Sequence, residues 1–489
     1  SSRRVCSDSV RSEPVTWIPR WRRIWPIPTR VHLVGAGGIH MSAIGQILRH
    51  RGIQVTGSDL TLSEHTRRLE ALGAHVYAGH AAAQIGDALL VVTTAAAKPD
   101  NPELLEARAR GIPVILRAEM VQRLIADRDV LAVAGTHGKT TTSSMLTLMC
   151  VRGDLDPLVL LGGDARDLDD ANCRDGDGRV AVVEADEYAE AFLQYEPRIA
   201  VITNIEVDHL DYYGTAEAYR TAFERFAARV RSDGTLIVCA DAAWALELGL
   251  ARRAAGAHVE RYGLDSEDAE WRGTRVRGND RGGLDCTVSL NGTELGRLSV
   301  GVPGRHNLLN ALGALAAAMR AGVDFHRAAA AASAFTGARR RFEVKGEAAV
   351  EGGTVTVVDD YAHHPTEVRA TVLAARQRFA GRRLVGCFQP HTYTRTVYLL
   401  DEFKTCFEGL DALYILRTYA AREDPDRGMD AHALAAQIVR PAPVTLDSFE
   451  EATARLASDL RPGDVFITIG AGDVTDLGPM VLSALEARR

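Results

Sequence analysis

The chain has 489 residues, of which 46 % are hydrophobic and 25 % are charged, and its formal net charge at pH 7 is -7. This composition is typical of folded proteins, and the length exceeds what one hydrophobic core supports, so we expect several domains. Because no long basic stripe follows residue 30, nucleic acid is excluded as the main partner. No uninterrupted apolar run reaches about 18 residues, which excludes a membrane span.

The seven cysteines are scattered and never form a CxxC pair. This pattern argues against a disulfide framework or a zinc knuckle, and it favours a reducing, cytoplasmic location. Residues 1–28 are rich in arginine but lack the apolar segment of a secretory signal. We expect a disordered leader with no role in the chemistry, and a basic membrane-surface segment is the alternative.

Short apolar runs alternate with helical segments along the chain, which predicts an α/β fold with mostly parallel sheets. We place the domain boundaries at 29–126, 127–335 and 336–489. An alternating polar segment from Tyr262 to Leu298 predicts a small antiparallel part of the second domain. The predicted strands are Val31 to Val34, Leu90 to Thr93, Val130 to Ala134, Val180 to Glu184, Ile199 to Thr203, Thr354 to Val358, Leu384 to Phe388, Leu413 to Leu416 and Val465 to Ile469.

A glycine turn follows the first predicted strand, with the sequence Gly35-Ala36-Gly37-Gly38-Ile39-His40, and Asp59 ends the next strand. Such a turn before a helix suits a diphosphate group. The dinucleotide fingerprint requires a third glycine where this chain has His40, so a nucleotide diphosphate is favoured over NAD.

A second glycine loop, Gly135-Thr136-His137-Gly138-Lys139-Thr140, lies between the strand ending at Ala134 and a predicted helix. Backbone N–H groups and a helix N-terminus then surround an anion, which predicts an ATP site. Lys139 would reach the terminal phosphates and Thr140 would offer a hydroxyl to Mg²⁺. Val133 stands at the first glycine of the usual pattern, so the loop alone is a weak signal.

Two further residues close the strands that follow this loop. Glu184 ends one of them and His209 follows the other. A carboxylate and an imidazole at neighbouring strand ends could bind metal ions.

The third domain has two polar segments directly after strands, Asp359-Asp360-Tyr361-Ala362-His363-His364-Pro365 and Phe388-Gln389-Pro390-His391-Thr392-Tyr393-Thr394-Arg395. So many polar groups are costly to bury without partners. The pattern therefore favours a substrate-facing cleft over a core.

In this order, GTHGKTTT, EADE, TNIEVDH, PGRHNLLN, RRFE, DDYAHHPTE and FQPHTYTRT resemble the motifs of the Mur ligase family of peptidoglycan synthesis, from residue 31 to about residue 475. The resemblance implies a Rossmann-like N-terminal domain for a UDP-sugar, a central P-loop ATPase domain with a mostly parallel sheet, and a Rossmann-like C-terminal domain for an amino acid. It also implies amide ligation through an acyl phosphate, with ATP and Mg²⁺.

The resemblance assigns roles to single residues. Lys139 would contact the β- and γ-phosphates, Thr140 and Glu184 one Mg²⁺, and Glu184 with His209 a second. The nucleotide would also contact Gly135, Thr136, His137, Gly138, Thr141, Asn204, His306, Asn307, Asn310 and Arg341, the UDP-sugar Gly35, Gly37, Gly38, Ser42 and Asp59, and the amino acid Tyr361, His363 and Arg395. His363 or His364 is the candidate acceptor of the amine proton, with bulk water as the alternative.

Sister ligases carry a carbamylated lysine in the middle domain, whereas this chain has no lysine between residues 140 and 344. The resemblance thus favours the alanine-adding branch, which uses UDP-N-acetylmuramate and L-alanine, as a monomer or homodimer. The nearest alternative is the ligase that recycles an intact tripeptide, although its opening loop normally has a Cys-Gly pair. A nucleotide-dependent oxidoreductase and a nucleotide switch without catalysis are the alternatives from other classes. Two departures from the family pattern are His40, where many relatives have glycine, and Thr392, which is basic in some.

Overall fold

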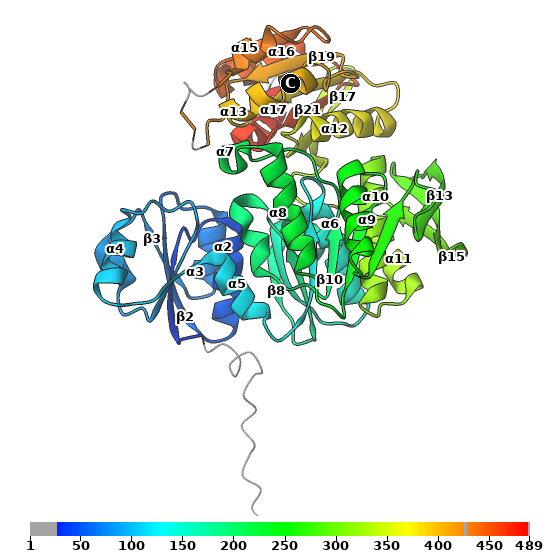
Figure 1. The fold of residues 1–489 in the computed structure, drawn as a ribbon. Coiled ribbons are helices and arrows are strands. Elements are labelled where there is room, and N and C mark those ends of the chain that lie inside the picture. Colours follow the sequence, from blue (N-terminus) through cyan, green and yellow to red (C-terminus); the bar gives the residue numbers. More distant parts are fainter. Residues whose placement is uncertain (1–26, 422, 425–427, 488–489) are drawn as a thin grey trace, which may run out of the picture.

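The computed structural model describes residues 27–421, 423–424 and 428–487. Three α/β domains follow one another along the chain (Figure 1). The blue N-terminal domain lies beside the cyan-to-green central domain, and the yellow-to-red C-terminal domain caps the central one. The predicted α/β class with mostly parallel sheets is confirmed. Residues 1–26 of the predicted leader lie outside the described residues.

The N-terminal domain has a parallel five-stranded sheet in the order β3-β2-β1-β4-β5. The order reverses at β1, and ligands of such sheets bind beyond the carboxyl ends of the strands at that point. The glycine turn at Gly35 begins there. The elements are β1 (Arg30–Val34), α2 (Ile39–His50), β2 (Gln54–Asp59), α3 (Glu64–Ala71), β3 (His75–Ala78), η1 (Ala82–Ile85), β4 (Leu90–Thr93), α4 (Pro102–Ala109), β5 (Val114–Leu116) and α5 (Arg117–Ile125).

The central domain is built on a ten-stranded sheet in the order β15-β14-β13-β12-β11-β10-β6-β9-β7-β8. Its middle strands are parallel, while β8 at one edge and β13 to β15 at the other form antiparallel pairs. The predicted antiparallel part is thereby confirmed. The strands are β6 (Asp129–Ala134), β7 (Leu158–Ala165), β8 (Ala171–Asp175), β9 (Val180–Glu184), β10 (Ile199–Ile202), β11 (Thr235–Cys239), β12 (Val259–Gly263), β13 (Trp271–Gly278), β14 (Leu284–Leu290) and β15 (Thr293–Val300).

Two buried helices of this domain, α6 and α10, pack against each other. The alanine-rich sequence of α10 gives it a small cross-section, so the two helix axes can approach closely. The helices are α6 (Lys139–Arg152), η2 (Arg166–Leu168), η3 (Tyr188–Gln194), α7 (Leu210–Tyr213), α8 (Ala216–Ala228), α9 (Ala243–Ala254), α10 (Arg305–Arg320) and α11 (Phe325–Ala334).

The C-terminal domain has a six-stranded sheet in the order β16-β17-β21-β18-β19-β20, parallel except for the β16–β17 pair. Its elements are β16 (Glu343–Val350), β17 (Gly353–Asp360), α12 (Pro365–Arg378), β18 (Leu384–Phe388), α13 (Tyr393–Tyr398), α14 (Leu400–Phe403), β19 (Ala412–Leu416), α15 (Ala431–Ala435), β20 (Pro443–Leu446), α16 (Phe449–Asp459), β21 (Val465–Ile469), η5 (Asp473–Asp476) and α17 (Leu477–Glu486). Each sheet lies inside one of the three proposed domain ranges, whose exact limits stay a prediction.

This topology brings the predicted site together. In the central sheet β10, β6 and β9 are parallel neighbours, so the residues after Ala134, Glu184 and Ile202 share one edge. The polar segments after β17 and β18 flank β21 in the C-terminal sheet. They meet that edge at His364, beside His137, and at Arg395, paired with Asp208. No helix of the described residues is long and apolar enough to cross a membrane.

A buried charge cluster stabilises the N-terminal domain. The Glu103 carboxylate accepts hydrogen bonds from Ser58 Oγ at 2.7 Å, His80 Nδ1 at 2.9 Å and His32 Nε2 at 3.2 Å. Both Glu103 and His32 have side chains with no exposed surface. Burial alone would raise the pKa of Glu103, but the three donors hold it below the ordinary value.

We expect Glu103→Ala to destabilise this domain by about 1–3 kcal/mol, because His32 Nε2 is left buried without its acceptor. Since the pKa of Glu103 is lowered in the folded state, its contribution is present above the ordinary glutamate pKa and is lost as the pH falls through the folded value. Urea unfolding followed by circular dichroism measures the loss, with the exposed Glu70→Ala on α3 as control. Equal midpoints for the two variants would contradict this account.

Candidate active site

The phosphate loop, Gly135 to Gly138, joins β6 to α6 and is held by its neighbours. Gly135 has φ +139°, and a Cβ there would lie 2.0 Å from Thr203 Oγ1. Gly138 has φ +79°, and a Cβ there would lie 2.6 Å from Asn310 Oδ1. Both positions therefore require glycine. The loop leads into the N-terminus of α6, which favours an anion.

Asn204, predicted to contact the nucleotide, holds the phosphate loop from the end of β10. Its Oδ1 accepts a hydrogen bond from the backbone N–H of His137 at 2.9 Å, and its Nδ2 donates to the carbonyl of His137 at 3.1 Å. The conformation of the loop thus depends on the Asn204 side chain, which binds the backbone of His137 on both sides.

Lys139 lies folded over the loop. Its Nζ donates to the carbonyls of Gly135 at 2.6 Å and Thr136 at 3.0 Å, and to Glu187 Oε1 at 2.9 Å. Burial opposes the charge, but Glu187 and the nearby acids Asp186 and Glu184 raise the pKa of Lys139 above its ordinary value. The side chain is therefore an ammonium group. The pairing with Glu187 was not foreseen from the sequence.

Thr140 and Glu184, two of the predicted metal ligands, lie together. Thr140 Oγ1 donates to Glu184 Oε1 at 3.1 Å, and the backbone N–H of Gly162 donates to Glu184 Oε2 at 2.9 Å. Burial raises the pKa of Glu184 above its ordinary value, which a bound cation would reverse. A buried carboxylate beside a hydroxyl fits Mg²⁺, which prefers oxygen ligands.

His209, the third predicted metal ligand, comes after β10 at the same edge of the sheet, but the carboxylates it contacts are not that of Glu184. Its Nε2 lies 3.8 Å from Glu187 Oε1 and 3.9 Å from Asp208 Oδ2. Glu187 thus lies between Lys139 and His209.

A small pocket of about 130 Å³ separates the phosphate loop from the C-terminal domain. Burial lowers the pKa of His306, one of its lining residues, to about 4, so this imidazole is neutral. Eight of the residues predicted to contact the nucleotide line the pocket, namely His137, Gly138, Thr141, Asn204, His306, Asn307, Asn310 and Arg341. Thr366 and Glu367 of α12 complete the wall, which the sequence did not indicate.

A larger cleft of about 540 Å³ lies between the N-terminal glycine turn and η3 of the central domain. Gly35, Gly38 and Asp59, three of the residues predicted to contact the UDP-sugar, line it. The backbone N–H of Gly37 donates to Asp59 Oδ2 at 2.9 Å, which fixes the turn. Ser42 is fully buried, and its hydroxyl donates to the carbonyl of Ile39. It thereby stabilises the first turn of α2, directly after the glycine turn.

Other lining residues of this cleft were not predicted to be site residues, although His40 lies in the glycine turn and Asp186 in the EADE motif. They include His40, His80, Arg117 and Asp186. Arg117 and Asp186 form an ion pair of 3.3 Å between the N-terminal and central domains. Burial lowers the pKa of His40 to about 3 in this setting, so its imidazole is neutral.

The residues predicted to hold the amino acid lie at the edge of the C-terminal sheet. His363 Nδ1 lies 3.1 Å from the carbonyl of Tyr361 and 3.2 Å from Glu367 Oε2. Both partners accept, so Nδ1 carries the proton and Nε2 keeps its lone pair. Burial holds the pKa of His363 well below its ordinary value, and the ring is neutral.

Arg395 makes a buried ion pair across the domain boundary. Its Nε and Nη2 donate to Asp208 Oδ1 at 3.0 and 2.9 Å. The residue predicted to grip the amino acid is therefore tied to the central domain beside His209.

A change at the phosphate loop tests the nucleotide site. We expect Gly135→Ala to weaken the binding of a non-hydrolysable ATP analogue about 10- to 100-fold, because the strained backbone costs about 1–3 kcal/mol. Calorimetric titration measures the affinity. Gly278→Ala, where a Cβ meets nothing within 4 Å, is the control. Equal affinities of the two variants would show that the loop is not the nucleotide site.

Three family profiles match the chain in succession. They are described as the Mur ligase family catalytic domain over residues 30–129, the Mur ligase middle domain over 133–318, and the Mur ligase glutamate ligase domain over 340–472. The UDP-N-acetylmuramate–L-alanine ligase of Saccharopolyspora erythraea is 46 % identical, over 94 % of this chain and 93 % of its own length. That of Mycolicibacterium vanbaalenii is 45 % identical, over 94 % of this chain and 97 % of its own.

Solved structures agree with these matches. The UDP-N-acetylmuramate–alanine ligase of Thermotoga maritima aligns with a TM-score of 0.79 at 28 % identity, over 94 % of this chain and all of its own. A murein peptide ligase of Psychrobacter arcticus aligns with a TM-score of 0.71 at 25 % identity, over 94 % and 99 %. With relatives this similar over nearly its whole length, the chain belongs to the Mur ligase family.

Proposed function

We propose that this protein joins L-alanine to the lactyl carboxylate of UDP-N-acetylmuramate, with cleavage of ATP to ADP and phosphate. Relatives that are 41–46 % identical to this chain are named UDP-N-acetylmuramate–L-alanine ligase. The observation that carries the proposal is the pocket that the phosphate loop shares with α12. His137 and Gly138, directly before Lys139, line it from the loop, and Glu367, whose Oε2 lies 3.2 Å from Nδ1 of the neutral His363, lines it from α12. The phosphate loop with Lys139 is suited to phosphoryl transfer, and His363 is suited to accepting a proton.

The reaction follows from the chemistry of a carboxylate, which acylates poorly because oxide would be its leaving group. A carboxylate oxygen first attacks the γ-phosphorus of ATP, which gives an acyl phosphate and ADP. The amine of L-alanine then attacks the carbonyl carbon, the bond to phosphate breaks, and one amine proton leaves. Lys139, held as an ammonium group, would stabilise the charge that builds on the transferred phosphoryl group.

We propose that Mg²⁺ binds at Thr140 and Glu184, with His209 contributing to a second ion. The raised pKa of the buried Glu184 and its contact with the Thr140 hydroxyl support this assignment. When bound, the ion would offset the repulsion between triphosphate and carboxylate. Glu187 is a further carboxylate beside these proposed ligands. It accepts a hydrogen bond from Lys139 Nζ and lies 3.8 Å from His209 Nε2.

His363 is the better of the two candidate proton acceptors. His364 Nδ1 accepts a hydrogen bond from the backbone N–H of Thr366 at 3.3 Å, which occupies its lone pair. His363 instead donates through Nδ1 and leaves Nε2 free. A neutral imidazole with a free lone pair is what general base catalysis requires.

The remaining assignments follow from this reaction. We propose that the cleft at Gly35, Gly38 and Asp59 takes the UDP-sugar, and that Tyr361 and Arg395 lie near the amino acid. ATP and a UDP-sugar are cytoplasmic metabolites, so we place the enzyme in the cytoplasm, in peptidoglycan precursor synthesis and hence in the maintenance of cell shape and division.

Phosphate release tests the proposed reaction. With ATP, Mg²⁺ and UDP-N-acetylmuramate, we expect sustained release only when L-alanine is added. Lys139→Ala should lower turnover at least about 10²- to 10³-fold, because the main positive charge at the phosphates is removed. UDP-N-acetylmuramate binding, measured by calorimetry, should persist. Release with an intact tripeptide but not with L-alanine would identify the recycling reaction instead.

A change at His363 tests the proton acceptor. We expect His363→Gln to lower turnover at saturating L-alanine about 10²-fold, because the amine loses its base. Since the pKa of His363 lies well below 6.5, the base stays deprotonated at pH 6.5, and the acid limb of the wild-type profile should fall below that pH. A rate profile from pH 5 to 9 measures both effects. Unchanged kinetics in the variant would exclude the role.

A further inference from the structure

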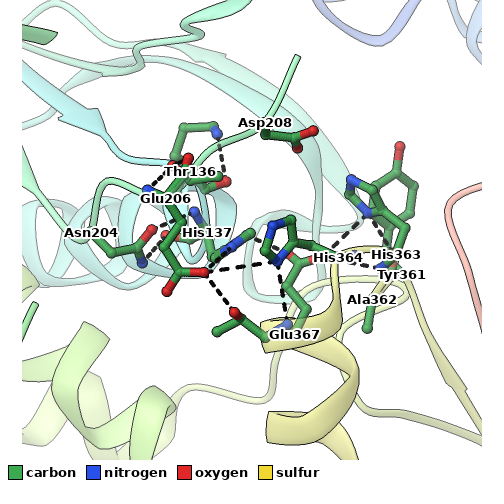
Figure 2. A network of polar contacts seen from close by, with 12 residues as sticks. Thr136, His137, Asn204, Glu206, Asp208, Tyr361, Ala362, His363, His364 and Glu367 are labelled. Atoms are coloured by element: carbon green, nitrogen blue, oxygen red, sulfur yellow. Dashed lines mark hydrogen bonds and ion pairs between the residues drawn. The ribbon is translucent and has the colours of Figure 1, made fainter. Parts of the chain in front are cut away.

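Glu206 lies at the boundary between the central and C-terminal domains, directly beside the phosphate loop (Figure 2). Its backbone N–H donates to Thr136 Oγ1 at 2.9 Å, so its position is tied to the loop. Its Oε2 accepts a hydrogen bond from Thr366 Oγ1 at 2.6 Å. Thr366 lies in the first turn of α12, whose N-terminus also favours a carboxylate. Glu206 therefore joins the loop to the start of α12.

His137 adds a second link between the same two domains. Its Nε2 lies 3.3 Å from Glu206 Oε2, and its Nδ1 lies 3.4 Å from Glu367 Oε1. Carboxylates only accept, so both ring nitrogens donate and the ring is an imidazolium. Burial opposes this charge, but Glu367 and Glu206 raise the pKa of His137 to about 9. Three more titratable groups face this contact: His364, whose ring lies 4.5 Å from that of His137 between centroids at a tilt of 48°, Arg341, 3.5 Å from Glu367 Oε1, and His363, 3.2 Å from Glu367 Oε2.

Glu367 connects these links to the proposed base. Its Oε2 accepts from the backbone N–H of His363 at 3.1 Å and from that of His364 at 3.4 Å. The same oxygen lies 3.2 Å from His363 Nδ1. A continuous set of polar contacts thus runs from the phosphate loop through His137 and Glu367 to His363.

A metal ion is the alternative occupant, because ligand atoms of His137, Glu206 and His364 lie within 4.8 Å of one another. Metal binding needs free nitrogen lone pairs. His137 uses both nitrogens as donors, and His364 Nδ1 accepts from Thr366 N–H, which leaves the proton on Nε2. In this arrangement neither His137 nor His364 Nδ1 offers a free lone pair to a metal ion.

We propose that Glu206 is a positioning residue that, with His137, Thr366 and Glu367, docks α12 on the phosphate loop and thereby places His363 at the acyl phosphate. The proposal rests on the ligase function proposed above. Glu206 itself does not line the nucleotide pocket. Its loss should therefore impair the attack by the amine more than the formation of the acyl phosphate.

The test compares Glu206→Ala and Glu206→Gln with Glu224→Ala, an exposed glutamate of α8 in the same domain. Hydroxylamine trapping without L-alanine measures acyl phosphate formation, and steady-state kinetics measure the use of L-alanine. We expect Glu206→Ala to raise the KM for L-alanine at least tenfold and to change trapping much less. Glu206→Gln, which keeps an acceptor for Thr366, should recover part of the loss. Because Glu206 and Thr366 form one contact, adding Thr366→Val to Glu206→Ala should cause little further loss.

Hydrogen exchange supplies a readout that does not depend on activity. Backbone amides of His363, His364, Thr366 and Glu367 should exchange faster in Glu206→Ala than in wild type, with Glu224→Ala unchanged. Unaltered exchange there, or a KM for L-alanine equal to that of wild type, would overturn the proposal. A visible Co²⁺ absorption band in the wild type that His364→Gln removes would also overturn it, in favour of a metal bridge. If the wild type traps no hydroxamate while the exchange difference persists, the proposed function fails and the docking role stands.

Discussion

The buried ammonium group of Lys139 is the constraint on which the site depends. A charge at this depth must be paired, and the acids at the ends of neighbouring strands, above all Glu187, provide the pairing. Because β10, β6 and β9 are adjacent and parallel, their carboxyl ends bring the loop, Glu184 and His209 to one edge of the sheet. The order of strands in the central sheet thus creates an anion site flanked by carboxylates. An ATP phosphate would replace Glu187 as the partner of Lys139.

The C-terminal domain contributes a second set of groups to the site, next to those of the phosphate loop and the central sheet. Arg395 pairs with Asp208, and Thr366 pairs with Glu206, and both contacts join the central and C-terminal domains. His363, held by Glu367 of the same domain, is neutral and keeps the lone pair of Nε2. Phosphoryl transfer and amine attack are therefore assigned to different domains, and their coupling depends on how the domains dock.

Local patterns predicted most of the fold. The strands Val180–Glu184, Leu384–Phe388 and Val465–Ile469 form with the predicted limits, since each is a short apolar run that ends in polar residues. The phosphate loop was also identified from the sequence, because glycine, lysine and threonine at fixed spacing are adjacent in the chain. Its assignment to one family depended on the order of several motifs rather than on the loop itself.

Contacts between distant segments were not predictable in the same way. The Lys139–Glu187 pair joins residues 48 positions apart, and Glu206 meets Thr366 across 160. Such pairs depend on how sheets and domains pack, which no local spacing encodes. The hydrogen bond from the Ser42 hydroxyl to the carbonyl of Ile39 was likewise not predicted, and the contact of Ser42 with the UDP-sugar stays a prediction.

The central claim is that the carboxylate is activated by phosphorylation before the amine attacks. Transfer of ¹⁸O tests it most directly, with UDP-N-acetylmuramate labelled in both oxygens of the lactyl carboxylate and supplied with ATP and L-alanine. One labelled oxygen should appear in the released phosphate, and the other should remain in the amide of the product. Amide formation with no label in the phosphate would contradict an acyl phosphate and with it the assignment of Lys139 and Glu184.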